Sequence, residues 1–175
     1  MIKNKSDLIE YLNEDKRIMN ANRRKPSLHQ VCWKYLILLR KAEYYTNVNC
    51  VWGGGVLKKW YQFRLNALSI KTGICIPINT FGKGLALPHY GTIIVNGSAR
   101  FGDYCVIQAG VNVSANVHGG SYVYLAPGAK INENLTIADH VIVGSNCVVT
   151  HSVEDEGCTV AVVPEKKISD KGFYR

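Results

Sequence analysis

The sequence lacks the long apolar runs and the cysteine motifs of membrane and metal-binding proteins. Its longest obvious apolar run, residues 35–39, is far too short to span a bilayer, and residues 1–16 contain no apolar signal core. The six cysteines form no CxxC pair and show no metal-ligand spacing. Reduced thiols without an export signal or an anchor are typical of the cytoplasm, so we expect a cytoplasmic protein with no transmembrane segment.

Acidic residues are scarce in the first half of the chain. Residues 1–73 carry 14 lysines and arginines against 5 aspartates and glutamates, whereas residues 74–175 carry 7 against 8. A basic half of this kind favours anionic partners such as nucleic acid, lipid head groups or a phosphorylated carrier. A solvated helical face that keeps the protein soluble explains the same charges, so both interpretations stay open.

A six-residue period dominates the second half of the chain. Ten residues spaced six apart form one series, called a comb here, and all but Gly119 have apolar side chains. They are Val95, Phe101, Ile107, Val113, Gly119, Leu125, Ile131, Ile137, Val143 and Val149. Every member of a second comb, four positions later, is small or aliphatic: Ala99, Cys105, Val111, Val117, Val123, Ala129, Leu135, Val141, Cys147 and Val153. Such a period fits neither a helix nor independent hairpins, and it is typical of short strands stacked coil upon coil in a solenoid. Thirteen hexads from Cys75 on, at three per coil, predict a mainly β fold of about four coils.

Three helices are expected before the coils, over residues 7–19, 28–45 and 56–70. Ser6 and Asp7 would cap the first helix, Ser27 would cap the second, and Gly73 would end the third. We interpret three tryptophans as helix-packing core rather than as a ligand site: Trp33, Trp52 and Trp60. The chain then divides into a helical N-terminal segment, a hexapeptide solenoid and a basic C-terminal tail, over residues 1–73, 74–160 and 161–175.

His89 lies beside the only phase break of the solenoid, since two extra residues, Ile93 and Ile94, follow it within four positions. A local irregularity in a regular scaffold can re-aim a side chain, as bulges do near active sites. Histidine is also the side chain best suited to accept a proton near neutral pH. The spacing therefore makes His89 a candidate catalytic base, with an ordinary turn histidine as the alternative.

Three stretches carry a resemblance to a known family: LPHYGTIIVNGSARFGDYCVIQAGVNV, LAPGAKINENLTIADHVIVGSNCVV and VAVVPEKKISDKG. Over residues 28–172 the chain resembles the serine acetyltransferase branch of the hexapeptide-repeat acyltransferases, and most closely the relatives encoded with bacterial surface-polysaccharide genes. The hexads are typical of the whole superfamily, whereas HYGTIIVN and PEKKISDKG narrow the resemblance to this branch. The resemblance implies a left-handed parallel β-helix, a homotrimer and acetyl-CoA as co-substrate.

The resemblance also gives His89 a role, because LPHYGT places it on the histidine of the family's DH-x-x-G motif. It would be the general base that removes the proton of the acceptor hydroxyl as the oxygen attacks the thioester carbonyl. Backbone N–H groups at the coil corners would stabilise the oxyanion. The implied activity is that of an acetyl-CoA-dependent O-acetyltransferase.

The positions that would recognise serine depart from the family pattern. Pro88 replaces an aspartate that contacts the amino acid, and a glycine-rich loop ending in RHPKI is shortened to SANVHGG, which keeps a histidine but not its arginine neighbour. The segment ICIPIN lacks the carboxylate that orients the base, which leaves a backbone carbonyl or Asn79 for that task. A sugar hydroxyl on a polysaccharide precursor is therefore favoured over L-serine, and both stay open. The expected acceptor-binding residues around the base are His118, Tyr90, Asn96 and Asn112.

Small residues are expected to admit the pantetheine arm of CoA between neighbouring coils. The cofactor-binding residues expected for this arm are Ala115, Ala126, Pro127, Gly144 and Ser145. Lys166 and Lys167 are placed for the CoA phosphates, although a solvated basic tail explains them equally well. The family's G-V-P-A is replaced by VVPE at residues 162–165, whose bulk would narrow the groove.

A non-catalytic trimeric solenoid, serving as a scaffold or partner protein, is the alternative function, and the shortened loop and the VVPE bulk favour it. Hexapeptide carbonic anhydrases hold zinc with three histidines, two of them close in sequence. Here His118, His140 and His151 are 22 and 11 residues apart, so we expect no metal. A P-loop, a dinucleotide fingerprint and a Ser or Cys nucleophile motif are also absent. The expected partners are a small-molecule acceptor and further copies of this chain, and not nucleic acid.

Overall fold

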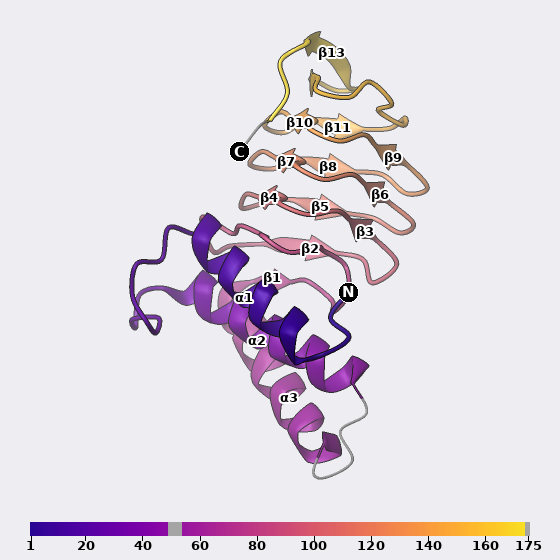
Figure 1. The fold of residues 1–175 in the computed structure, drawn as a ribbon. Coiled ribbons are helices and arrows are strands. Elements are labelled where there is room, and N and C mark those ends of the chain that lie inside the picture. Colours follow the sequence, from indigo (N-terminus) through magenta and orange to yellow (C-terminus); the bar gives the residue numbers. More distant parts are fainter. Residues whose placement is uncertain (49–53, 174–175) are drawn as a thin grey trace.

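Three helices and a solenoid of short parallel strands make up the computed structural model, which describes residues 1–48 and 54–173. The helices are α1 (Lys5–Ile18), α2 (Val31–Asn47) and α3 (Gly54–Thr72). They lie at one end of the solenoid, against its first coils, and the last strand lies at the opposite end (Figure 1). Within the described residues, no helix is long and apolar enough to cross a membrane.

Two of the three helices have N-cap residues that differ from those expected from the sequence. Asn4 caps α1, because its side-chain oxygen accepts the N–H of Asp7 at 2.9 Å. Ser27 does not cap the second helix, which starts three residues later than expected, after an N-cap, Gln30, that makes no side-chain cap bond. The Gln30 side chain instead accepts the N–H of Ser27 at 2.9 Å. The third helix ends as expected before Gly73, whose φ of +75° glycine adopts without strain.

The solenoid strands are two to four residues long. They are β1 (Ile74–Cys75), β2 (Ile93–Val95), β3 (Arg100–Phe101), β4 (Val106–Ile107), β5 (Asn112–Val113), β6 (His118–Gly119), β7 (Tyr124–Leu125), β8 (Lys130–Ile131), β9 (Thr136–Ile137), β10 (Ile142–Val143), β11 (Val148–Val149), β12 (Thr159–Ala161) and β13 (Lys166–Ser169). They form three sheets, named here by one member each: the β2 sheet (β1, β2, β5, β8, β11), the β3 sheet (β3, β6, β9) and the β4 sheet (β4, β7, β10, β12, β13). Neighbouring strands are parallel except β12 and β13, which form an antiparallel hairpin.

The solenoid has about five coils, one more than the hexad count predicted. On the β3 face, isolated bridges between Phe81 and Phe101 and between Ile137 and Val153 add a rung at each end. The count from the sequence stopped where the spacing of six ends. The chain nevertheless returns after an irregular turn, and β12 pairs with β10 in parallel to complete the fifth coil.

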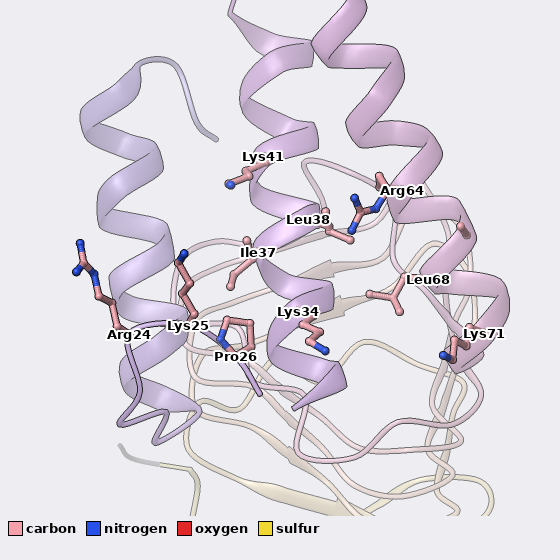
Figure 2. A pocket seen from close by; sticks show the side chains of 11 residues that line it. Arg24, Lys25, Pro26, Lys34, Ile37, Leu38, Lys41, Arg64, Leu68 and Lys71 are labelled. Carbon is pink, nitrogen blue, oxygen red and sulfur yellow. The ribbon is translucent and has the colours of Figure 1, made fainter. Parts of the chain in front are cut away.

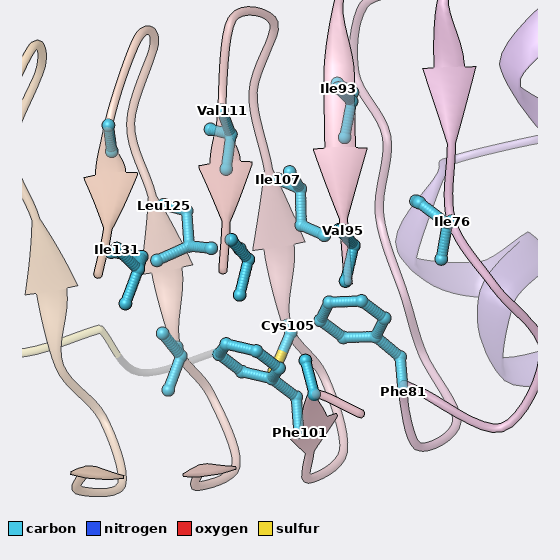
Figure 3. Packing of buried hydrophobic residues seen from close by; sticks show 14 of the residues in the cluster. Ile76, Phe81, Ile93, Val95, Phe101, Cys105, Ile107, Val111, Leu125 and Ile131 are labelled. Carbon is cyan, nitrogen blue, oxygen red and sulfur yellow. The ribbon is translucent and has the colours of Figure 1, made fainter. Parts of the chain in front are cut away.

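Both six-residue combs point into the solenoid and form its core (Figure 3). Every member is buried except Gly119, which is partly buried, and the structure explains this single non-apolar position. A Cβ on Gly119 would overlap the ring of Phe101, which stacks on Phe81 with the ring centroids 4.8 Å apart. Cys105 and Cys147 are buried in this core, and burial raises the pKa of the Cys105 thiol to about 12.

A buried ion network fixes the helices to the first coil. The guanidinium of Arg40 on α2 is fully buried and donates to Asp15 of α1 at 2.7 Å and to Glu43 at 3.0 Å. It also donates to the carbonyl oxygens of Phe81 at 3.0 Å and Gly82 at 2.6 Å, both in the first coil. A buried cation with this many acceptors is fully compensated, so α1, α2 and the first coil are held in one fixed arrangement.

The expectation that the tryptophans form core is confirmed for one of the two that the structure describes. Trp33 is 4% exposed, whereas Trp60 on α3 is 46% exposed; Trp52 lies outside the described residues. α2 and α3 pack side by side and leave a groove between them (Figure 2).

Candidate active site

Four successive turns of the chain stack into one corner of the solenoid, between the β4 and β2 sheets. We call this the histidine corner, and its turns are residues 88–92, 108–111, 126–129 and 144–147. Backbone hydrogen bonds link each turn to the one before it: Gly110 N–H to Thr92 O at 2.7 Å, Gly128 N–H to Ala109 O at 3.0 Å, and Asn146 N–H to Pro127 O at 2.9 Å. The turns approach so closely that a Cβ on Gly110 would lie 3.2 Å from the Gly128 backbone.

His89 lies on the first turn of the histidine corner. Its side chain is exposed and forms no hydrogen bond with any residue that the structure describes. It lines a pocket of about 230 Å³ between the histidine corner and the segment that joins α1 to α2. The lining residues are Met19, Ala21, His29, Gln30, Val31, Cys32, Trp33, Pro88, His89 and Tyr90.

The described lining of the pocket can form hydrogen bonds but offers no carboxylate, ammonium or guanidinium group. Among the described residues, no aspartate, glutamate, lysine or arginine lines it, and its polar side chains are two imidazoles, an indole, an amide, a phenol and a thiol. Moving a charged group from water into a site without a countercharge is costly, whereas hydroxyl groups need only hydrogen-bond partners. The lining therefore suits an uncharged hydroxyl compound better than a zwitterion.

The expected acceptor-binding residues do not all meet at this pocket within one chain. Tyr90 lines it beside His89. Asn96 lies on the next corner, after β2, while Asn112 lies on the outer side of the β2 sheet. His118 lies on the outer side of the β3 sheet, in β6. Because the β3 face lies opposite the histidine corner, the solenoid keeps His118 away from the His89 of the same chain.

Asn79 does not orient His89. Its side-chain amide exchanges two hydrogen bonds with the amide of Asn47 on α2, at 2.7 and 2.9 Å, and its backbone N–H donates to Glu43 at 2.8 Å. These partners hold Asn79 against the helices. Since His89 makes no hydrogen bond to a described backbone carbonyl either, neither orienting partner expected from the sequence is in place.

Four of the seven expected cofactor-binding residues share the histidine corner with His89: Ala126, Pro127, Gly144 and Ser145. With coils spaced by about 4.8 Å, their two turns lie about 10 and 14 Å along the corner from the turn of His89. Ala115 lies on the neighbouring corner, between β5 and β6. Lys166 and Lys167 lie on β13, where Lys167 pairs with two carboxylates at 2.7 Å each.

Glu165 turns its side chain away from the histidine corner. Its carboxylate accepts the N–H and the hydroxyl of Thr150, both at 2.9 Å, and the N–H of His151 at 2.7 Å, at the other end of β11. Burial acts to raise the pKa of Glu165, but these hydrogen bonds outweigh burial and lower the pKa to about 2. The side chain of Glu165 was expected to narrow a CoA groove. It instead attaches the C-terminal hairpin to the last coil through Thr150 and His151.

Comparison with known proteins gives sequence relatives although no family model matches the chain. It is 31% identical over 110 residues to a serine acetyltransferase of Synechococcus elongatus and 28% identical over 135 residues to one of Staphylococcus xylosus. The alignments cover 58% and 67% of this chain, but only 45% and 62% of the two relatives. The chain is homologous to the serine acetyltransferase family of hexapeptide-repeat transferases.

Solved structures of serine acetyltransferases share the fold. The crystal structure of the enzyme from Brucella abortus strain S19 has a TM-score of 0.76 at 20% identity, covering 97% of this chain and 72% of that chain. The same enzyme in complex with coenzyme A has a TM-score of 0.78 at 20% identity, covering 97% and 71%. The match to these crystal structures therefore covers both the helices and the solenoid of this chain. The chain spans only part of the length of the sequence relatives and of the solved structures.

Sequence reasoning missed the side of the pocket that the helical segment builds. The contributing residues are Met19, Ala21, His29, Gln30, Val31, Cys32 and Trp33. No motif or period marks them, and they reach His89 because the buried Arg40 network and the bonds of Tyr35 to Ile76 fix α2 against the first coil. The one available signal was His29 itself, a second imidazole outside the repeat.

Proposed function

We propose that this serine acetyltransferase homologue is an acetyl-CoA-dependent O-acetyltransferase that acetylates a hydroxyl of a neutral acceptor, a sugar. His89 acts as the general base. The observation that carries the proposal is the pocket beside His89, which offers no described countercharge for the ammonium and carboxylate of serine. His29, Gln30 and Tyr90 offer imidazole, amide and phenol groups that can bind sugar hydroxyls.

In the proposed reaction the imidazole of His89 accepts the proton of the acceptor hydroxyl while that oxygen attacks the thioester carbonyl carbon. The tetrahedral intermediate then loses the CoA thiolate, which takes the proton from the imidazolium, so the products are an acetyl ester and CoA. A positioned base of this kind contributes about 10²–10⁴ in rate. The backbone N–H groups of His89 and Tyr90 bond to no described backbone carbonyl and are available for the oxyanion.

The histidine corner supports acetyl-CoA as the donor. Solved serine acetyltransferases with this fold are in complex with CoA. The turns of Ala126 and Gly144 lie in line with the turn of His89, so an extended pantetheine arm along this corner brings its thioester to the base. The backbone is close-packed there, since a Cβ on Gly144 would lie 3.1 Å from the Cβ of Ala161.

The proposed assembly is a homotrimer. His118 lies on the β3 face, opposite the histidine corner of the same chain, so it can contribute to the site of His89 only from a neighbouring copy. A cyclic arrangement of three copies sets the face of one solenoid against the corner of the next. Within the chain, Tyr104 packs against α1 and Tyr124 against Phe173.

An assay of thiol release from acetyl-CoA, run against serine, homoserine and a panel of sugars and sugar nucleotides, tests the proposal. We expect kcat/KM for the best sugar to exceed that for serine, because the pocket supplies no ion-pair partner. L-serine is the second candidate, favoured by the homology to serine acetyltransferases. Efficient acetylation of serine with no sugar competing would refute the neutral acceptor while leaving the acetyl transfer intact.

Isothermal titration with CoA tests the alternative, a non-catalytic solenoid scaffold. If the protein is an enzyme, titration with CoA must give a binding heat, and acetyl-CoA must compete with CoA for the site. A protein that shows no heat with either and releases no thiol with any acceptor is a scaffold.

A further inference from the structure

Six basic side chains surround the groove between α2, α3 and the segment before α2. The groove has a volume of about 650 Å³, and its basic residues are Arg24, Lys25, Lys34, Lys41, Arg64 and Lys71. Lys34, Arg64 and Lys71 extend from both helices into the space between them (Figure 2). Ile37, Leu38 and Leu68 supply apolar surface to the same groove.

No carboxylate of the described residues neutralises this groove. Glu43 is the only acidic residue between Asp15 and Asp103 in the sequence, and it is buried in the ion pair with Arg40. None of the six groove cations forms an ion pair with a described carboxylate. Six like charges around one apolar hollow repel one another and lower the stability of the helical segment. An anionic ligand removes that repulsion.

A row of exposed apolar residues runs along α3 beside the groove. Val56, Trp60, Phe63 and Ile70 are 74%, 46%, 70% and 87% exposed. Their spacing of four, three and seven places them on one side of the helix, with the exposed Ala67 between the last two. Isolated apolar residues are common on protein surfaces, but a continuous row of large ones marks an interaction site. We call these five residues the α3 apolar row.

We propose that the groove and the α3 apolar row dock on a membrane surface that contains anionic phospholipids. The six cations bind lipid phosphates, and the apolar row inserts among the acyl chains near the head groups, as in other interfacial helices. A nucleic acid would use the cations but leave the apolar row in water. A second copy of this chain would bring another groove of the same charge.

Docking in this manner goes beyond the proposed acetyl transfer and has a consequence for it. The segment between α1 and α2 lines both sites: Arg24 and Lys25 belong to the groove, while Ala21 and His29 belong to the pocket of His89. A membrane-bound groove therefore holds the acceptor pocket close to the lipid head groups.

Vesicle flotation tests the docking without any substrate. We expect the protein to float with vesicles of phosphatidylcholine and phosphatidylglycerol, to stay in solution with phosphatidylcholine alone, and to lose binding as salt rises. Each basic residue near an anionic surface contributes about 1 kcal/mol, so the triple variant Lys34→Gln, Lys41→Gln, Lys71→Gln should bind roughly 100-fold more weakly. The matched control is Arg100→Gln, Lys130→Gln, Lys171→Gln, which removes three charges outside the groove and should bind as wild type.

A second variant isolates the apolar row. Phe63→Ser with Ile70→Ser keeps every charge and should lower vesicle binding at least tenfold, because two large side chains no longer enter the apolar layer. Both side chains are exposed, so circular dichroism should show an unchanged fold.

Unaltered binding by this variant, or binding to an oligonucleotide but not to vesicles, would refute the membrane proposal. A larger mass in light scattering that the same variant abolishes would instead show that a second copy covers the row. Thiol release is measured separately, so failure of docking and failure of acetyl transfer are distinguishable.

Discussion

At the scale of single residues, His89 and His29 are the two imidazoles in one neutral pocket, and only one of them lies on the histidine corner. We expect His89→Ala to lower kcat about 100-fold or more, because the base is lost, while titration calorimetry shows nearly unchanged CoA binding. His29→Ala is the matched control and should raise KM for the acceptor with a smaller effect on kcat. Full turnover by His89→Ala would show that His89 is a turn residue. Loss of kcat in His29→Ala alone would move the base to the helical side of the pocket.

Gly119 offers a second test at this scale, since its missing side chain leaves room for the ring of Phe101. We expect Gly119→Ala to destabilise the protein by about 1–3 kcal/mol, because the buried ring must leave its stacked position on Phe81. Gly55→Ala on α3 is the control: nothing lies within 4 Å of the added Cβ, and alanine favours a helix by up to about 1 kcal/mol. Denaturant unfolding followed by circular dichroism measures both changes. Equal stability of the two variants would contradict the packing.

At the scale of elements, the hairpin of β12 and β13 depends on one carboxylate. Glu165 has a pKa of about 2 in the folded protein against 4.5 in the unfolded chain, so its hydrogen bonds with Thr150 and His151 stabilise the fold fully above pH 4.5. This contribution, up to about 3 kcal/mol, is lost as the pH falls from about 4.5 to about 2. We expect Glu165→Gln to be less stable than wild type at pH 7, with the difference shrinking below pH 4.5. Thermal unfolding across this pH range tests it, and a difference that does not depend on pH would exclude ionic hydrogen bonding as the cause.

The elements also show which signals in the sequence were sufficient. The six-residue combs predicted the solenoid correctly because a stacked coil buries the same repeat position whatever surrounds it. The fifth coil was missed because residues 154–158 break the spacing before β12 rejoins the ladder of β10. The start of the second helix was wrong because Gln30, rather than Ser27, precedes its first turn. Trp60 was expected in the core because apolar content alone does not say whether a helix face has a partner.

At the scale of the whole molecule, half of the candidate site could be predicted from the sequence. The phase break next to His89 and the small residues of the histidine corner lie within the repeat, where register fixes position. The opposite wall of the pocket comes from a segment about sixty residues away, and its position depends on Arg40 binding the first coil. The hand of the coil and the copies that complete the site stay predictions.

The trimer carries the last prediction, because one chain holds His89 on the histidine corner and His118 on the opposite β3 face. We expect sedimentation equilibrium to give three times the 19.5 kDa of one chain. If each site combines His89 of one copy with His118 of the next, His89→Ala and His118→Ala are both impaired alone. Co-expressed, the two variants assort at random, and about a quarter of the sites regain both histidines. Activity of the mixture near a quarter of wild type shows a shared site, whereas no recovery on mixing confines the site to one chain. A 19.5 kDa monomer at micromolar concentration would remove the trimer and with it the contribution of His118 to the site.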